Sequence, residues 1–329
     1  MKSVCVVGQG SWGTAVANIF AEAGQTTVIW GRDPKVSQAI NERNENSHYL
    51  KGIKLSKNLT ASQDLKSCLI NCDLIVNALP TQAIREVFKP HASLLKNKHV
   101  MNTAKGIEIG TNQRVSEIFH EIEKTIVYSI LSGPSFAVET ARKHPTAVTL
   151  ASIKKEEAET VQQMMTVPYF RTYTSDDVVG VELAGALKNI IAISSGIVSG
   201  LGLGYNTQAA LINRGLIEIM RLGKVLNAKP MTFFGLAGMG DLILTCTGPL
   251  SRNRNFGVAL GQGKTVADAL KAIGGVAEGY YTAKSAYSLS QKLQIEMPIL
   301  EQVHQILYDG KNPKQAVTDL MNRELKDEW

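Results

Sequence analysis

The sequence contains few cysteines, few aromatic residues and few prolines, and each scarcity excludes a class of protein. Four cysteines in 329 residues are too few for a disulfide scaffold. Cys68 and Cys72 stand four positions apart, but no second ligand pair or nearby histidine accompanies them, so reduced buried thiols are expected rather than a zinc site. Aromatic residues make up 6% of the chain and do not interleave with a run of basic residues, which argues against nucleic-acid binding. Ten prolines and a hydrophobic content of 44% exclude a disordered or fibrous chain.

The length and the charge narrow what remains. A chain of 329 residues is typical of about two domains. The formal net charge is +6, from 35 Lys and Arg against 29 Asp and Glu. This modest positive excess suits small acidic substrates, phosphates above all.

Two apolar stretches resemble targeting or membrane segments. The first begins at Met1, but Gly8 and Gly10 and their polar neighbours interrupt it too early for a signal peptide. The second, residues 189–213, carries no charge and is long enough to span a bilayer, yet it contains glycines and several Ser, Asn and Gln residues. A buried helix followed by a glycine-rich loop explains it better. No membrane insertion and a cytoplasmic location are therefore expected.

The periodicity of apolar residues predicts two domains of different class. The first half alternates short apolar runs with helical stretches, which is typical of βαβ units around a parallel sheet. A helix is expected over 13–23, and strands over 3–7, 27–30, 74–78, 99–103, 126–131 and 147–151. After Ser175 helical periodicity dominates, and helices are expected over 179–199, 207–226, 266–273, 283–293, 299–308 and 313–323. The fold class is therefore α/β, with a Rossmann-like dinucleotide-binding domain over 1–178 and an all-α domain over 179–329 that contributes substrate and catalytic residues.

Residues 8–13 form the pattern G-x-G-x-x-G, with glycines at Gly8, Gly10 and Gly13. The pattern alone is weak, because glycines recur in ordinary turns. Here it follows an apolar strand and opens an amphipathic helix at the N-terminus, where the first turn of a dinucleotide fold belongs. Glycines at these positions let the backbone approach a pyrophosphate, which the helix N-terminus then stabilises.

The end of the second strand carries the determinant for the ribose. An Asp or Glu there selects NAD, whereas an Arg accommodates the 2′-phosphate of NADP. The chain reads Trp30-Gly31-Arg32-Asp33, so Arg32 favours NADPH, while Asp33 remains a rival and Arg32 can also be a solvated loop cation.

Two strand ends supply further candidates, because the carboxyl ends of parallel strands face the ligand. Lys105 follows one predicted strand, and residues 133–137, which include Gly133 and Ser135, follow another. A loop lysine is usually a solvated charge, so position alone leaves this pair open.

Lys188 stands out in the helical half because its helix neighbours Ala184, Gly185 and Ala192 are small. Small neighbours leave room for a ligand against that face of the helix. Burial would lower the pKa of the lysine and let it exchange a proton with an alcohol near neutral pH. A surface lysine on an amphipathic helix is the alternative.

A polar, glycine-bearing segment interrupts the helical half over residues 238–255. Ser251, Arg252 and Asn253 can begin a helix whose free N–H groups and guanidinium bind a phosphate. The alternative is an ordinary Ser or Asn helix cap beside a solvated arginine.

Taken together, these segments resemble the bacterial-type NAD(P)-dependent glycerol-3-phosphate dehydrogenase family over nearly the whole chain. The matching blocks are residues 8–17, 104–106, 133–137, 182–189, 206–211 with 214–215, 238–241 and 251–253. Two positions depart from the usual pattern, Ala104 where Thr is commoner and Ser194 where Gly or Ala is commoner. Neither departure removes a functional group.

The resemblance implies a role for each matched residue. Lys188 would be the general base, or the acid in the reverse direction, at the C2 oxygen. The residues implied to hold the glycerol phosphate are Lys105, Gly133, Ser135, Lys188, Asp241, Ser251, Arg252 and Asn253. Those implied to line the dinucleotide are Ser11, Trp12, Arg32, Lys105, Ala137, Arg252, Val276 and Glu278.

The activity implied is NAD(P)H-dependent reduction of dihydroxyacetone phosphate to sn-glycerol 3-phosphate, which supplies phospholipid synthesis. The family also implies NADH or NADPH as cofactor, no metal and a homodimer. Two alternatives stay open: a related hydroxyacid dehydrogenase that acts on a carboxylate, and a dinucleotide-binding sensor without catalysis.

Overall fold

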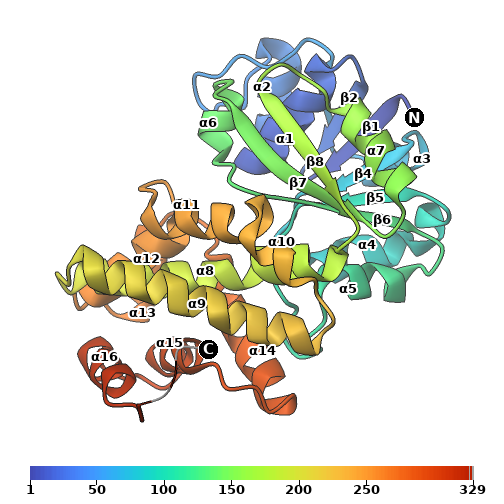
Figure 1. Cartoon of the computed structure of the whole chain (residues 1–329). Coiled ribbons are helices and arrows are strands. Elements are labelled where there is room, and N and C mark those ends of the chain that lie inside the picture. The colour runs from blue at the N-terminus through green and yellow to red at the C-terminus, as the bar shows by residue number, and fades with distance from the viewer. Residues whose placement is uncertain (326, 328–329) are drawn as a thin grey trace.

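An eight-stranded sheet forms the N-terminal half of the computed structural model, which describes residues 1–325 and 327 (Figure 1). The strand order is β3-β2-β1-β4-β5-β6-β7-β8. Neighbouring strands are parallel except β6 and β7, which are antiparallel. The strands are β1 (Ser3–Val7), β2 (Thr26–Trp30), β3 (Leu59–Ser62), β4 (Leu74–Asn77), β5 (His99–Asn102), β6 (Val127–Ser132), β7 (Thr146–Ser152) and β8 (Phe170–Ser175).

The predicted strands are confirmed to within one or two residues, and two further strands were not predicted. β3 has only four residues, and only Leu59 among them is buried. β8 alternates buried and exposed positions over its first four residues and contains two Thr, one Ser and one Arg among six residues, so it lacks the apolar run that marked the other strands. The sheet is parallel as expected except at one pairing, where β7 runs antiparallel to β6.

Helices cover the sheet and then take over the chain. Those associated with the sheet are α1 (Ser11–Glu22), α2 (Pro34–Arg43), α3 (Leu65–Ile70), α4 (Ile84–Phe88), α5 (Val115–Ile122), α6 (Ala137–Ala141) and α7 (Lys155–Met164). The helical half contains α8 (Val178–Gly200), α9 (Tyr205–Val225), α10 (Pro230–Phe234), α11 (Asp241–Thr247), α12 (Arg252–Gly261), α13 (Val266–Ala272), α14 (Glu278–Lys292), α15 (Pro298–Tyr308) and α16 (Pro313–Met321). The six helices predicted after Ser175 are therefore confirmed. α10 and α11 were missed because they are short and flank the glycine-rich π-helical segment Leu236–Gly240.

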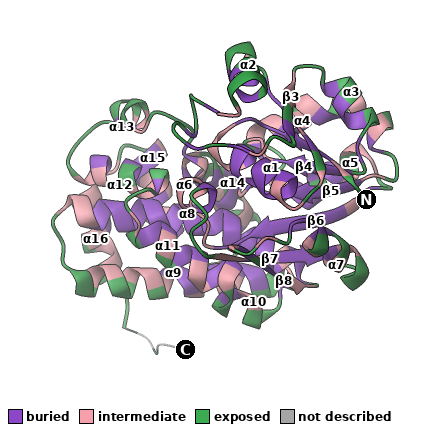
Figure 2. Ribbon diagram, turned by 90° about the horizontal axis from the view of Figure 1, so that it is seen from above, coloured by how far each residue is buried: buried purple, intermediate pink, exposed green. Residues whose placement is uncertain are grey.

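Helix α8 is the central element of the helical half. It is the one helix in the described part of the chain that is long and apolar enough to cross a membrane, and its apolar window is entirely buried within the protein. Figure 2 shows it as a buried rod. The expectation of a buried helix that ends in a glycine-rich loop is thus confirmed, since α8 ends at Gly200 and α9 begins at Tyr205.

A buried carboxylate anchors the start of α8 in the sheet domain. Glu182 accepts hydrogen bonds from the backbone N–H of Ser116 at 2.8 Å and from the hydroxyl of Tyr128 at 2.6 Å. Arg114 completes the group with an ion pair at 2.8 Å. Because Ser116 belongs to α5 and Tyr128 to β6, these bonds fix α8 against two elements of the other domain.

Glycines bring α12 into close contact with α8. A Cβ on Gly196 of α8 would lie 2.0 Å from the carbonyl oxygen of Arg254, and one on Gly257 of α12 would lie 2.0 Å from that of Ile193. Side chains at these positions would separate the helices. The close approach sets the N-terminus of α12 beside Asn189 of α8, which directly follows Lys188.

Candidate active site

The glycine turn between β1 and α1 has the geometry of an anion-binding loop. Gly8 has φ +123°, and a Cβ there would lie 2.7 Å from the carbonyl oxygen of Ala78, so only glycine fits. A Cβ on Gly13 would lie 1.9 Å from the oxygen of Gly8, whereas one on Gly10 would meet nothing within 4 Å. No side chain caps α1, and its first turn carries no acidic residue. The free N–H groups at this helix end therefore fit a bound pyrophosphate.

Ser11 and Trp12 form the first turn of α1, next to the segment that follows α2. The Ser11 hydroxyl donates to the carbonyl oxygen of Tyr49 at 3.0 Å. The indole Nε1 of Trp12 is buried and has no hydrogen-bond partner among the described residues. Tyr49 is 42% exposed, and no sequence motif had singled it out.

The two candidate ribose determinants at the end of β2, Arg32 and Asp33, differ in their contacts. The carboxylate of Asp33 caps α2 and accepts from the backbone N–H of Lys35 at 2.9 Å. Gln9, from the glycine turn, donates to the carbonyl oxygen of Asp33 at 3.1 Å. The side chain of Arg32 is exposed beside this junction. Asp33 thus has a structural role in the helix cap that Arg32 does not share.

Two lysines from different domains each contact one oxygen of the same buried carboxylate. Lys188 Nζ lies 2.5 Å from Oδ1 of Asp241, and Lys105 Nζ lies 2.6 Å from Oδ2. Lys105 also donates to the carbonyl oxygen of Gly133 at 3.3 Å. The side chains of Asp241 and Lys188 are 2% and 7% exposed, so this group is withdrawn from bulk water. Lys105 follows β5, whereas Lys188 and Asp241 belong to α8 and α11, so the group joins the sheet domain to the helical domain.

Burial sets the protonation of this group. Desolvation lowers the pKa of Lys188 to about 8, with a smaller contribution from repulsion by Lys105, while the attraction of Asp241 opposes the shift. Burial works against ionisation of Asp241 as well, but the two lysines together hold the pKa of this carboxyl below its ordinary value. At neutral pH the group therefore contains a carboxylate and an ammonium that can release its proton.

Thr245 is a member of this group that the sequence patterns did not reveal. Its hydroxyl accepts from Lys188 Nζ at 2.6 Å and donates to the carbonyl oxygen of Asp241 at 2.6 Å. The signal available in the sequence was its position one helical turn after Asp241, which places both on one face of α11.

A line of amide contacts connects Lys105 to α12 and α14. Asn189, next to Lys188, donates to the carbonyl oxygen of Lys105 at 3.2 Å and accepts from Asn253 at 3.0 Å. Asn253 in turn accepts from the backbone N–H of Gly279 at 3.0 Å. Ser251 caps α12 by accepting from the N–H of Arg254. Asn189 was part of a matched block but had not been named as a site residue.

Glu278, at the start of α14, carries an unpartnered buried oxygen. Its Oε1 accepts from the backbone N–H of Thr81 at 3.3 Å, whereas Oε2 has no partner among the described residues. Burial raises the pKa of Glu278 to about 7. Arg252 is exposed, and its guanidinium lies close to Gly275, where a Cβ would be 2.7 Å away. Val276, at 37% exposure, follows directly.

The remaining candidates lie at the carboxyl end of β6. Gly133 has φ +154°, and a Cβ there would lie 2.8 Å from Val148 Cα. Ser135 donates to the carbonyl oxygen of Gly133 at 2.9 Å, and Ala137 begins α6. Gly133 is therefore connected to the lysine and aspartate group by its hydrogen bond with Lys105. The hydrogen bonds described for residues 1–325 do not connect Ser135 or Arg32 to that group directly. Over the same residues and 327, no cluster of His, Cys, Asp and Glu is placed to hold a metal ion.

Comparison with known proteins assigns the family. Two family models match, NAD-dependent glycerol-3-phosphate dehydrogenase N-terminus over residues 3–158 and C-terminus over residues 177–318. The chain belongs to this family. It is 47% identical over 331 residues to glycerol-3-phosphate dehydrogenase [NAD(P)+] of Citrifermentans bemidjiense, covering 99% of each chain. It is 47% identical over 328 residues to the enzyme of that name from Carboxydothermus hydrogenoformans, covering 99% of this chain and 98% of the relative.

Solved structures agree with this assignment. The crystal structure of glycerol-3-phosphate dehydrogenase from Coxiella burnetii matches with a TM-score of 0.94 at 39% identity, covering 98% of this chain and 99% of that one. GPD1 of Saccharomyces cerevisiae matches with a TM-score of 0.82 at 30% identity, covering 98% and 99%. The fold class predicted from the sequence is thereby confirmed.

Proposed function

We propose that the protein catalyses the reversible, NAD(P)H-dependent reduction of dihydroxyacetone phosphate to sn-glycerol 3-phosphate, where its two domains meet. The observation that carries the proposal is the buried group in which Lys188 and Lys105 share the carboxylate of Asp241. A buried ammonium with a pKa near 8 suits proton exchange with the oxygen of a carbonyl or alcohol. The family of the chain supplies the identity of the substrate and of the cofactor.

The residues of the glycine turn fit the dinucleotide. Gly8, Gly10 and Gly13 let the backbone approach the pyrophosphate at the uncapped start of α1. The other residues that would line the dinucleotide are Ser11, Trp12, Arg32, Lys105, Ala137, Arg252, Val276 and Glu278. When bound, the reduced nicotinamide supplies a hydride to the carbonyl carbon. The cap formed by Asp33 supports Arg32 as the ribose determinant, and NADPH is the preferred cofactor.

Lys188 is the acid of the reduction and the base of the reverse reaction. Its ammonium would stabilise the alkoxide that develops on the C2 oxygen and then protonate it. Asp241 and Thr245 hold Nζ from two directions at 2.5 Å and 2.6 Å, which limits the positions that the ammonium can take. A fixed donor costs less reorganisation in the transition state than a mobile one.

The phosphate of the substrate is assigned to the start of α12. Ser251 and Asn253 are held there by the cap and by the amide contacts with Asn189, and Arg252 supplies the charge. Lys105, Gly133 and Ser135 would complete the site from the sheet domain, and Asp241 from the helical domain. Binding energy at the phosphate would position the reacting carbon.

A steady-state assay tests the proposal. Oxidation of NADH and of NADPH is followed by absorbance with dihydroxyacetone phosphate, and again with 2-keto and 3-keto acids of similar size. Turnover confined to the phosphorylated ketone supports the proposal. Preferential turnover of keto acids indicates a hydroxyacid dehydrogenase instead, and tight dinucleotide binding with no turnover indicates a sensor.

The wider role follows from the family. The protein would act in the cytoplasm as a homodimer and supply sn-glycerol 3-phosphate to phospholipid synthesis. Complete burial of the one long apolar helix found in the described residues, α8, supports an enzyme that is not inserted in a membrane. Sedimentation of the full chain tests the dimer, and a single species of monomer mass over the working concentration range would exclude it.

A further inference from the structure

The side chain of Gln9 extends from the glycine turn to the segment that follows β2. Its Nε2 donates to the carbonyl oxygen of Asp33 at 3.1 Å, and its Oε1 accepts from the hydroxyl of Ser37 at 3.3 Å. Both Gln9 and Ser37 are buried. Gln9 therefore connects the turn between β1 and α1 to the loop between β2 and α2.

Gly31 makes room for this side chain. A Cβ on Gly31 would lie 2.0 Å from Cδ of Gln9 and 2.2 Å from its Cγ, so the Gln9 side chain fills the space that a larger residue at position 31 would take. The φ of Gly31 is not positive, so the backbone conformation does not itself require glycine. Close packing against Gln9 is the reason that glycine fits here.

The contacts of Gln9 lie on both sides of Arg32. Gln9 packs against the residue before it, Gly31, and bonds the carbonyl group of the residue after it, Asp33. Arg32 is itself exposed, and its carbonyl oxygen accepts a long hydrogen bond of 3.5 Å from the exposed side chain of Gln63. The direction in which an exposed side chain leaves the protein follows that of its backbone. The buried contacts of Gln9 therefore set the direction of Arg32.

The backbone of Gln9 is fixed as well. The amide of Asn46 donates to the carbonyl oxygen of Gln9 at 2.9 Å and to the hydroxyl of Thr14 at 2.8 Å. Thr14 donates to the same carbonyl oxygen of Gln9 at 3.3 Å. Asn46 and Thr14 are completely buried. The side chain of Gln9 thus begins at a point that two buried groups hold in place.

We propose that Gln9 is a positioning residue that determines cofactor selectivity by holding the backbone on both sides of Arg32. The inference rests on the proposed function, in which Arg32 binds the 2′-phosphate that distinguishes NADPH from NADH. Gln9 does not have to touch that phosphate. Its contacts reduce the conformational freedom that the Arg32 segment would otherwise lose on binding, and a preorganised group binds more tightly. NADH lacks the 2′-phosphate and gains little from this order.

Dissociation constants for NADPH and NADH, measured by fluorescence titration of the full chain, test the inference without reference to turnover. Selectivity is the Kd for NADH divided by the Kd for NADPH. Gln9→Ala should lower it roughly threefold to tenfold, the range expected for lost hydrogen bonds, by weakening NADPH binding while NADH binding changes little. Gln38→Ala is the matched control, because Gln38 is an exposed glutamine of α2 that bonds Glu42, and its selectivity should stay normal.

Two further variants examine how Gln9 acts. Gly31→Ala should displace the Gln9 side chain and reproduce the loss of selectivity, which provides a test even if Gln9→Ala does not fold. In a protein that already carries Arg32→Ala, Gln9→Ala should lower selectivity no further, because the group that it positions is absent. A merely structural role of Gln9 would weaken both cofactors alike and would not depend on Arg32.

The possible results distinguish this inference from the proposed function. Normal selectivity in Gln9→Ala and Gly31→Ala, while Arg32→Ala lowers it, would overturn the inference and leave the proposed function intact. Equal weakening of NADPH and NADH in Gln9→Ala, or a further loss of selectivity in the double variant, would also overturn it. Normal selectivity in Arg32→Ala would instead overturn the ribose assignment within the proposed function.

Discussion

Lys188 Nζ lies 2.5 Å from Oδ1 of Asp241, and both side chains are almost completely buried. A buried ammonium is costly unless a carboxylate compensates it, so each of these groups depends on the other. The second lysine, Lys105, leaves the group with one net positive charge at neutral pH. This uncompensated charge would attract an anionic ligand bound beside the group.

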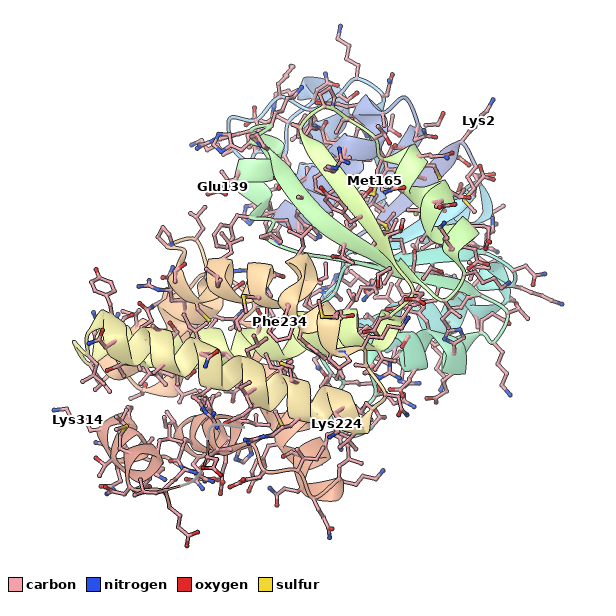
Figure 3. The ribbon with its side chains drawn as sticks, viewed as in Figure 1. Lys2, Glu139, Met165, Lys224, Phe234 and Lys314 are labelled. Carbon is pink, nitrogen blue, oxygen red and sulfur yellow. The ribbon has the colours of Figure 1, made fainter. Side chains whose placement is uncertain are left out.

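Replacement of the buried lysine should separate catalysis from cofactor binding. Lys188→Ala is expected to lower turnover by roughly two to four orders of magnitude, the usual contribution of a positioned acid or base. Dinucleotide affinity should change little, because the glycine turn lies in the other domain. Lys224→Ala, at the exposed end of α9 labelled in Figure 3, is the control and should keep normal turnover. Near-normal turnover of Lys188→Ala would remove this lysine from the mechanism.

The pH dependence of the two directions should be opposite. Reduction needs protonated Lys188, so its rate should fall as pH rises through the lysine pKa of about 8, whereas oxidation needs the neutral amine and should rise over the same range. Stopped-flow rates in both directions measure the two inflections.

Asp241→Asn tests the origin of that inflection. The attraction of Asp241 raises the pKa of Lys188 against desolvation, so its removal should move both inflections to lower pH. Asp319→Asn on α16 is a control for loss of a negative charge elsewhere. An inflection that stays in place in Asp241→Asn would mean that the titrating group is not Lys188.

Two glycines of one turn should respond to alanine in different ways. At Gly10 a Cβ meets no protein atom within 4 Å, so Gly10→Ala should keep the stability of the fold and weaken dinucleotide binding. At Gly13 a Cβ would lie 1.9 Å from the oxygen of Gly8, and Gly13→Ala should cost about 1–3 kcal/mol of folding free energy. Denaturant unfolding and fluorescence titration with NADPH distinguish the two effects. Equal destabilisation by both substitutions would contradict this account of the turn.

Arg32 and Asp33 should affect cofactor choice and stability separately. Arg32→Ala is expected to reduce the preference for NADPH over NADH roughly tenfold, because a charged hydrogen bond to the 2′-phosphate is lost. Asp33→Ala removes the cap of α2 and should cost about 1 kcal/mol of stability, with the cofactor preference retained. The ratio of kcat/KM for NADPH to that for NADH measures the preference. An unchanged ratio in Arg32→Ala would mean that another residue recognises the ribose.

The exposed guanidinium at the start of α12 should determine substrate affinity. Arg252→Ala is expected to raise the KM for dihydroxyacetone phosphate by roughly tenfold or more. Arg171→Ala, on the exposed side of β8, is the matched loss of a positive charge and should leave KM unchanged. A normal KM in Arg252→Ala would place the phosphate elsewhere.

Local patterns in the sequence predicted most of the fold. The turn at residues 8–13 and the apolar strands depend on neighbours along the chain, and they were predicted correctly. β8 was not predicted, because its polar sequence with Thr and Ser resembles that of a loop. The antiparallel direction of β7 was not predicted, because strand direction depends on how the chain returns to the sheet, and a short stretch of sequence does not contain that information.

The same patterns predicted fewer of the site residues. The small neighbours of Lys188 predicted a special lysine, but only the resemblance to a family pointed to Asp241, 53 residues away. The contacts of Thr245 and Asn189 join residues 57 and 84 positions apart, so no spacing rule reveals them.

The hydrogen bonds around Glu182 have a consequence for motion. The anchor and the reacting lysine stand on the same continuous helix, with its first turns locked to α5 and β6 and its middle turns carrying Lys188. The hydrogen bonds of Glu182 therefore tie the helix that carries Lys188 directly to the sheet domain. Any displacement of the reacting amine away from α5 and β6 would have to break these buried bonds, whereas movement of elements that do not contact Glu182 would leave them intact.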